Sequence, residues 1–167
     1  AGSHRVLPLE VEEVRNSDGH AKQDCELNAA KRLIPRLRQD HPQMPLIVGG
    51  DDLYAHEPFI AQLRTHRLQH VLVGKPGSHA EVYKWVEALA RLGACEVGQW
   101  TEGAACRRRF FEYRVARQIP LTATRRIWCT FVEVWERDRT GQLRYHNAWV
   151  TDLGVDSHNV AAIVQSG

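Results

Sequence analysis

The sequence lacks the features that mark several classes of protein. Its four cysteines, at positions 25, 95, 106 and 129, form no Cys-x-x-Cys pair, which argues against a zinc site and favours reduced thiols. No apolar run approaches the length of a membrane-spanning helix, and no signal peptide is visible, so we expect a cytoplasmic protein without a membrane partner. Internal repeats and low-complexity segments are also absent. With 43% hydrophobic residues, the 167-residue sequence therefore predicts one compact globular domain.

Net charge is small but unevenly distributed. The overall charge of +2 combines a nearly neutral first hundred residues with a basic segment at 101–145, which holds ten Lys/Arg and five Asp/Glu. A basic segment of this kind suits a phosphate-binding surface, because each neutralised phosphate releases condensed counterions. A basic face that is merely solvated explains the same charge.

The stretch at 45–54 organises the rest of the chain. Its short apolar run is closed by Gly49 and Gly50, which predicts a buried strand, and two carboxylates, Asp51 and Asp52, follow at once. A helix starting near Pro58 and a second apolar run at 70–74 complete a strand–helix–strand unit, which indicates an α/β fold. Ligands of such sheets lie past the carboxyl ends of the strands, although a loop with a helix-capping carboxylate fits Asp51 and Asp52 equally well.

The remaining patterns predict further helices and strands. We expect a strand at 6–14 and a helix capped by Asp24 whose regular part ends before Ile34, because Pro35 should break or kink it. The outer face of that helix is basic, which suits DNA or simple solvation, and its cations are Lys31, Arg32, Arg36 and Arg38. A capping box of Ser78 and Glu81 should open a helix that ends at Gly93 and buries Trp85.

The second half of the chain has strand periodicity. Residues 108–116, 127–135 and 143–151 read as an antiparallel meander, with a hairpin turn at 139–142 between the last two strands. A helix should begin near residue 160.

Several motifs resemble those of DDE-type insertion-sequence transposases. They are Gly-Asp-Asp-Leu-Tyr at 50–54, Val-Gly-Lys-Pro-Gly-Ser-His at 73–79, Tyr-Lys-Trp at 83–85, Lys-Gln-Asp-Cys-Glu at 22–26, Asn-Ala-Ala-Lys-Arg at 28–32 and Asn-Ala-Trp-Val-Thr-Asp at 147–152. The motifs stand in the family's order, and the resemblance covers the chain from about residue 6 onward. The first four residues, Ala-Gly-Ser-His, look like a purification-tag remnant and are not part of the predicted domain.

The resemblance implies a fold, a division of the chain and a metal. It implies part of a ribonuclease H-like core, related to that of retroviral integrases, at 5–97 and 153–167, with a β-strand insertion at 98–152. In such enzymes three carboxylates hold two Mg²⁺ or Mn²⁺ ions for phosphodiester chemistry. Asp51 occupies the position of the second carboxylate, whereas Asp52 stands where the family often has a small residue and is the weaker candidate ligand.

The other two carboxylates should lie outside this sequence. The first belongs to a strand upstream, and the third is a glutamate expected just beyond Gly167. We therefore interpret the chain as an internal fragment of a transposase catalytic domain that is inactive by itself, from a protein that acts on DNA as a homodimer.

The resemblance also implies DNA contacts. Lys75, at the end of the second strand, is a candidate phosphate ligand, and the run Arg107, Arg108 and Arg109 offers forked guanidinium groups that match phosphate oxygens. Trp149 and Trp128 could stack on an extruded base, although Trp128 is expected to pack against the sheet.

Two alternatives stay open. The first is a transposase-derived protein that binds nucleic acid or another partner without catalysis. The second is a small metal-dependent nuclease, which would need Asp18, Asp24, Asp51 and Asp52 to converge.

Overall fold

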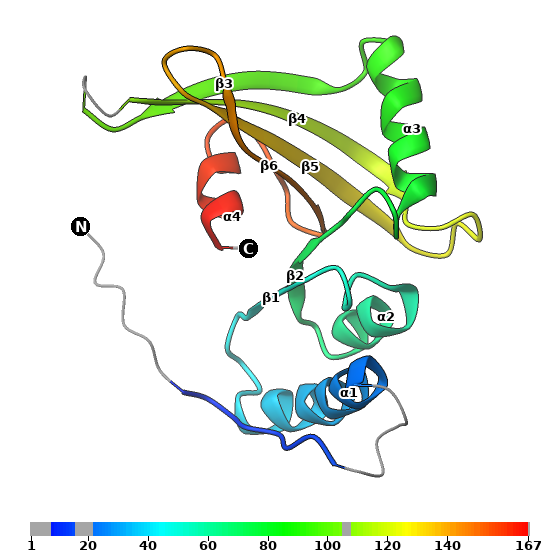
Figure 1. Ribbon diagram of the computed structural model, residues 1–167. Helices are drawn as coiled ribbons and strands as arrows, with labels where there is room; N and C mark the ends of the chain where they lie inside the picture. Colours follow the sequence, from blue (N-terminus) through cyan, green and yellow to red (C-terminus); the bar gives the residue numbers. More distant parts are fainter. Residues whose placement is uncertain (1–7, 16–21, 105–107, 167) are drawn as a thin grey trace.

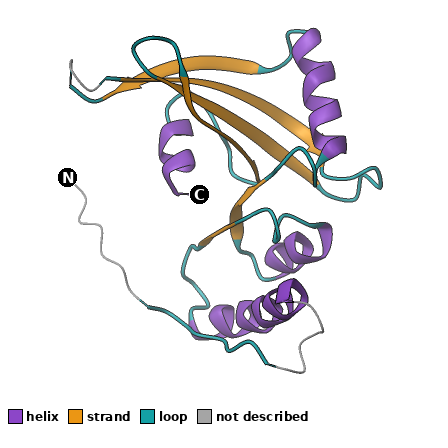
Figure 2. Cartoon of the chain, in the orientation of Figure 1, coloured by secondary structure: helices purple, strands orange, loops and turns teal. Residues whose placement is uncertain are grey.

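The computed structural model of the chain describes residues 8–15, 22–104 and 108–166. Its six described strands form a single open sheet in the order β1-β2-β6-β5-β4-β3 (Figure 1). The strands are β1 (Ile47–Gly50), β2 (Gln69–Val73), β3 (Glu96–Glu102), β4 (Arg109–Pro120), β5 (Trp128–Arg137) and β6 (Leu143–Thr151). The helices are α1 (Lys22–Asp40), α2 (Glu57–Thr65), α3 (Ala80–Arg91) and α4 (Val160–Ser166) (Figure 2). The fold is therefore mixed α/β, as the sequence predicted.

The sheet joins a parallel unit to an antiparallel meander. Strand β1 runs parallel to β2 through the crossover helix α2, and the strands from β3 to β6 pair antiparallel with their neighbours. The two parts meet where Val71 of β2 faces Thr151 of β6. The predicted strand–helix–strand unit and the three-strand meander are thus confirmed, and they share one continuous sheet. Strand β3, which pairs with β4, was not predicted.

Helices cover both faces of the sheet. One core cluster packs α2 and α3 on the first face, through residues such as Ile60, Val82 and Phe131. The other packs α4 on the opposite face, through Val160 and Trp149. Successive strand residues point to opposite faces, so neighbours such as Val71 and Leu72 belong to different clusters. Figure 1 shows α3 and α4 on opposite sides of the sheet.

Helix α1 does not end at Pro35, contrary to the prediction. It continues to Asp40. Proline lacks the N–H that would bond to the carbonyl four residues back, here that of Lys31. That carbonyl instead accepts a hydrogen bond from Nε2 of Gln62 in α2 at 2.6 Å, so a neighbouring helix satisfies the group that proline leaves free.

Three further local predictions are wrong. Residues 8–15 form no strand. Asp24 lies within α1 instead of capping it, because the helix already includes Lys22. The Ser78–Glu81 capping box does not form: the N-cap of α3 is His79 without a side-chain bond, and the Ser78 hydroxyl instead donates to Asp52.

Candidate functional site

The carboxyl ends of β1 and β2 bring the predicted site residues together. Because the two strands are parallel and Gly50 pairs with Leu72, Asp51 and Lys75 follow at the same edge of the sheet. Glycine at position 50 lets the side chains of Leu72 and Tyr54 pack closely against β1, since a Cβ there would lie 3.0 Å from Cδ2 of Leu72 and 3.2 Å from Cδ2 of Tyr54. The sequence-based expectation that the carboxylates lie past a strand end is confirmed.

The two neighbouring aspartates have different environments. Asp51 is exposed, and its Oδ1 accepts a bond from the backbone N–H of Leu53 at 3.0 Å. The Asp52 side chain is only 15% exposed; its Oδ1 accepts from the backbone N–H of Lys75 at 2.8 Å and its Oδ2 from the Ser78 hydroxyl. Burial raises the pKa of Asp52, but the donors from Ser78 and Lys75 outweigh burial, so the pKa lies below its ordinary value. Asp52 is therefore a bound carboxylate and Asp51 an accessible one.

A buried histidine lies behind Asp52. The Nε2 atom of His79 is 3.3 Å from Oδ1 of Asp52, and its ring stacks on that of His56 at a centroid distance of 5.8 Å. Burial lowers the pKa of His79 more strongly than the charge of Asp52 raises it, so the ring is neutral near pH 7.

Helix α1 adds a carboxylate that the motif analysis did not assign to the site. Burial raises the pKa of Tyr54, and the negative charges of Glu26 and Asp51 raise it further. Glu26 therefore acts on the same phenol as Asp51. The sequence signal for Glu26 was its place in the motif at 22–26, and helical periodicity could not show that its charge acts on Tyr54.

Metal-ligand geometry is not complete in the part of the chain that the structure describes, where no group of three or more His, Cys, Asp or Glu residues is placed to hold a metal ion. For the nuclease hypothesis, Asp18 lies outside the described residues.

The predicted arginine run does not join this site. Arg107 lies outside the described residues, Arg108 is exposed, and Arg109 opens β4. Arg109 pairs with Glu102 at 2.9 Å and with Glu136 at 3.7 Å, and its guanidinium lies 5.3 Å from the centroid of the Phe111 ring. Much of its charge is thus balanced within the protein.

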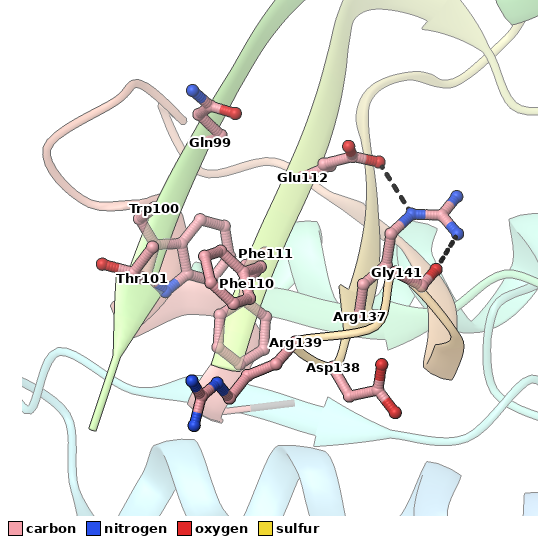
Figure 3. Close-up of a pocket in the computed structure, with 10 residues that line it drawn as sticks. All are labelled: Gln99, Trp100, Thr101, Phe110, Phe111, Glu112, Arg137, Asp138, Arg139 and Gly141. Atoms are coloured by element: carbon pink, nitrogen blue, oxygen red, sulfur yellow. Dashed lines mark hydrogen bonds and ion pairs between the residues drawn. The ribbon is translucent and has the colours of Figure 1, made fainter. Parts of the chain in front are cut away.

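A groove of about 650 Å³ lies between the start of β4 and the turn that joins β5 to β6 (Figure 3). Phe110 lines it and is 38% exposed. Arg137 is held at its rim by Glu112 at 3.3 Å and by the Gly141 carbonyl at 3.2 Å, whereas Arg139 points away from that pair in Figure 3. Sequence reasoning did not find this groove, because it depends on how two hairpins lie beside each other.

The burial of the two candidate tryptophans is the reverse of what the sequence predicted. Trp149 is 1% exposed and lies in the core under α4, so it is not on a surface where a base could stack. Trp128, expected to pack against the sheet, is 45% exposed and lines a groove of about 560 Å³ together with Arg64 and Arg117. Strands β2 and β5 run in the same direction on either side of β6, so Trp128, at the start of β5, lies at the opposite edge of the sheet from Asp51.

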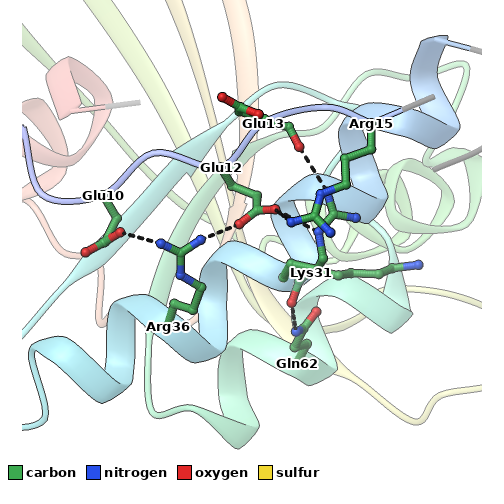
Figure 4. Close-up of polar contacts among 8 residues, drawn as sticks. Glu10, Glu12, Glu13, Arg15, Lys31, Arg36 and Gln62 are labelled. Carbon is green, nitrogen blue, oxygen red and sulfur yellow. Dashed lines mark hydrogen bonds and ion pairs between the residues drawn. The ribbon is translucent and has the colours of Figure 1, made fainter. Parts of the chain in front are cut away.

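Three cations on the basic face of α1, Arg32, Arg36 and Arg38, bind other parts of the protein. Figure 4 shows Arg36 bound to Glu10 and Glu12, with Arg–Glu distances of 3.2 and 2.6 Å. Arg32 donates to Glu12 at 2.8 Å, and the Glu12 side chain is 4% exposed. These arginines pin the extended segment 8–15 to α1, which neither of the two sequence-based readings of this face anticipated.

No protein-family model matches this chain, and no curated protein matches it in sequence. Among the described residues, no helix is both long enough and apolar enough to cross a membrane.

Proposed function

We propose that this chain is part of the catalytic domain of a DDE-type DNA transposase and that Asp51 is one of its metal-binding carboxylates. The observation that carries the proposal is the exposed carboxylate of Asp51 just past the carboxyl end of a strand, with Lys75 following the parallel neighbour. This is where open α/β sheets place their ligands. The mixed sheet supports a ribonuclease H-like core without specifying it.

The residues present fit one part of a Mg²⁺ or Mn²⁺ site. Asp51 offers a hard, solvent-facing oxygen, and such ions keep several water ligands and bind through few carboxylates. When bound, the ions would activate the attacking hydroxyl or water and stabilise the leaving oxygen. Lys75 is exposed at the same edge, where its ammonium would orient a substrate phosphate. Asp52 fits a ligand role less well, because its oxygens already accept two donors.

Strand β1 lies at one edge of the described sheet. Among the described strands, β1 pairs with β2 alone, so its other edge can accept a further strand. The resemblance puts the first carboxylate on an upstream strand and the third on a downstream helix. In this proposal the whole protein completes the site and acts as a homodimer on paired DNA ends.

The test is DNA cleavage and strand transfer by a protein extended in both directions, with Mg²⁺. We expect activity from the extended protein and none from the 167-residue chain. Asp51→Asn should lower the rate on the order of 100-fold or more, since an amide is a poor ligand for these ions. Asp40→Asn, at the exposed end of α1, is the matched control and should leave the rate unchanged. Cleavage by the short chain, or full activity of the Asp51→Asn protein, would refute the proposal.

The exposed Trp128, which lines a groove together with Arg64 and Arg117, favours a second candidate, a protein that binds single-stranded nucleic acid without catalysis. Base–aromatic stacking contributes about 1–3 kcal/mol per base. The test follows the fluorescence anisotropy of a labelled oligonucleotide. Affinity should fall between about 50 and 200 mM salt, and Trp128→Ala should weaken it roughly 5-fold or more. Binding by an extended protein that never transfers strands would favour this candidate.

A further inference from the structure

The carboxylate of Asp52 joins the two turns that carry Asp51 and Lys75. We propose that Asp52 is a positioning residue: it fastens the turn at 74–79 to the turn at 51–56 and so holds Asp51 and Lys75 at a fixed separation. Any catalytic consequence of this link rests on the proposed function, whereas the link itself does not.

Asp52 uses both of its oxygens in the link. Oδ1 accepts from the backbone N–H of Lys75 at 2.8 Å, and Oδ2 accepts from the hydroxyl of Ser78. His79 closes the third side with its Nε2 atom 3.3 Å from Oδ1. All three partners stand 23 to 27 positions later in the sequence, so the contacts connect two separate turns and do not merely shape one.

The turn that receives these contacts is itself closed. The backbone N–H of His79 bonds to the carbonyl of Lys75 at 3.0 Å, and the hydroxyl of Tyr83 donates to the carbonyl of Gly74 at 2.9 Å. A closed turn moves as a unit. The bonds that cross from Asp52 therefore add to the pairing of β1 with β2 in fixing the position of Lys75 relative to β1.

The neighbouring aspartate is arranged for a different task. The Asp51 side chain accepts a local bond from the N–H of Leu53 and faces solvent, where it can reach a metal ion. The Asp52 side chain is 15% exposed and lies among donors. Partners that orient a primary ligand typically change activity or metal affinity by about 10–100-fold when they are removed, and this is the range expected for Asp52.

Two substitutions separate positioning from metal binding. Asp52→Asn keeps an acceptor for the N–H of Lys75 and an amide that can donate to Ser78, so the link should survive without the charge. Asp52→Ala removes every bond. A metal ligand would be lost in both variants, because an amide replaces a carboxylate poorly at a hard cation.

The first measurement is amide hydrogen exchange of the 167-residue chain by NMR. Asp52→Ala should speed the exchange of the Lys75 amide roughly 10-fold or more, Asp52→Asn should change it by less than about 3-fold, and Asp51→Ala should leave it as it is. Unchanged exchange in Asp52→Ala would overturn the link, whatever the function of the protein.

The second measurement uses the extended protein and its rate of strand transfer as a function of Mg²⁺ concentration. Asp52→Ala should lower the maximal rate about 10-fold with the apparent Mg²⁺ affinity unchanged, and Asp52→Asn should restore most of the rate. If Asp52→Asn is as inactive as Asp51→Asn, Asp52 is a ligand and the positioning role is wrong. If no extended protein is active, the proposed function fails while the exchange measurement still decides the link.

Discussion

Arg38 fastens the end of α1 to the end of α2, and its replacement offers a direct test of the fold. In the described part of the chain, its guanidinium donates to five backbone carbonyls. The acceptors are the carbonyls of His41, Pro42 and Met44, which follow α1, and of His66 and Arg67, which follow α2. One side chain thus supplies donors to the carbonyls at two chain turns, which a planar fork of five N–H groups can do and a single ammonium cannot.

The size of the effect follows from the burial of these bonds. Two of them, from Nε to His66 at 2.8 Å and from Nη1 to His41 at 2.9 Å, are partly buried, and the other three are exposed. A hydrogen bond to a charged group contributes roughly 1.5–3 kcal/mol. Counting only the two partly buried bonds at the low end, Arg38→Ala should lower the free energy of unfolding by about 3 kcal/mol. For a chain of this size that loss corresponds to about 6–12 °C in Tm.

The assay is urea unfolding followed by circular dichroism, with thermal unfolding as a second probe. Arg38→Lys should recover no more than about a third of the loss, because the forked geometry is absent. Arg91→Ala, at the exposed end of α3, is the matched control and should change stability by less than about 0.5 kcal/mol. The reasoning is refuted if Arg38→Ala is as mild as the control, or if Arg38→Lys is as stable as the parent chain.

Two further predictions concern packing and pH. Gly98→Ala should lower the free energy of unfolding by about 1–3 kcal/mol, because a Cβ there would lie 2.5 Å from the Tyr113 ring. Gly77→Ala is the control and should be neutral, because a Cβ there has no atom within 4 Å. Equal midpoints of urea unfolding for the two variants would contradict this prediction. Burial lowers the pKa of both His70 and His79, so the unfolded chain binds more protons, and the free energy of unfolding should fall as pH drops below about 6.5 and on through the folded-state pKa values. Each histidine supplies a slope of up to about 1.4 kcal/mol per pH unit in that window, and a flat stability profile between pH 7.5 and 5 would contradict the prediction.

Short sequence patterns predicted part of the fold correctly. Apolar runs bounded by glycine marked β1 and β2, and alternation with a turn at 139–142 marked the hairpin of β5 and β6, in which Gly141 has a φ of 82°. These signals act over a few residues, so the sequence displays them. The same local rules misjudged Pro35, because the group that satisfies the freed carbonyl comes from Gln62, 31 positions away from Lys31.

Side-chain roles depended on distant partners. The cations of α1 look alike in sequence, yet Arg32 and Arg36 bind Glu12 whereas Arg38 binds carbonyls beyond two helices. Strand alternation puts Trp128 on the same face of the sheet as Val132 and its partner Trp149, yet Trp149 is buried in the cluster that packs against α4 whereas Trp128, at the start of β5, is exposed.

The sequence by itself determined the α/β class, the parallel strand–helix–strand unit and the position of Asp51 past a strand end, because hydrophobic period and glycine placement fix these locally. Only the tertiary structure decided that the meander continues the same sheet, that Trp128 is exposed and Trp149 buried, and that Asp52 is bound by Lys75 and Ser78. The reason is physical: each of these outcomes depends on which surfaces exclude water from one another, and those surfaces come from residues far apart in the chain.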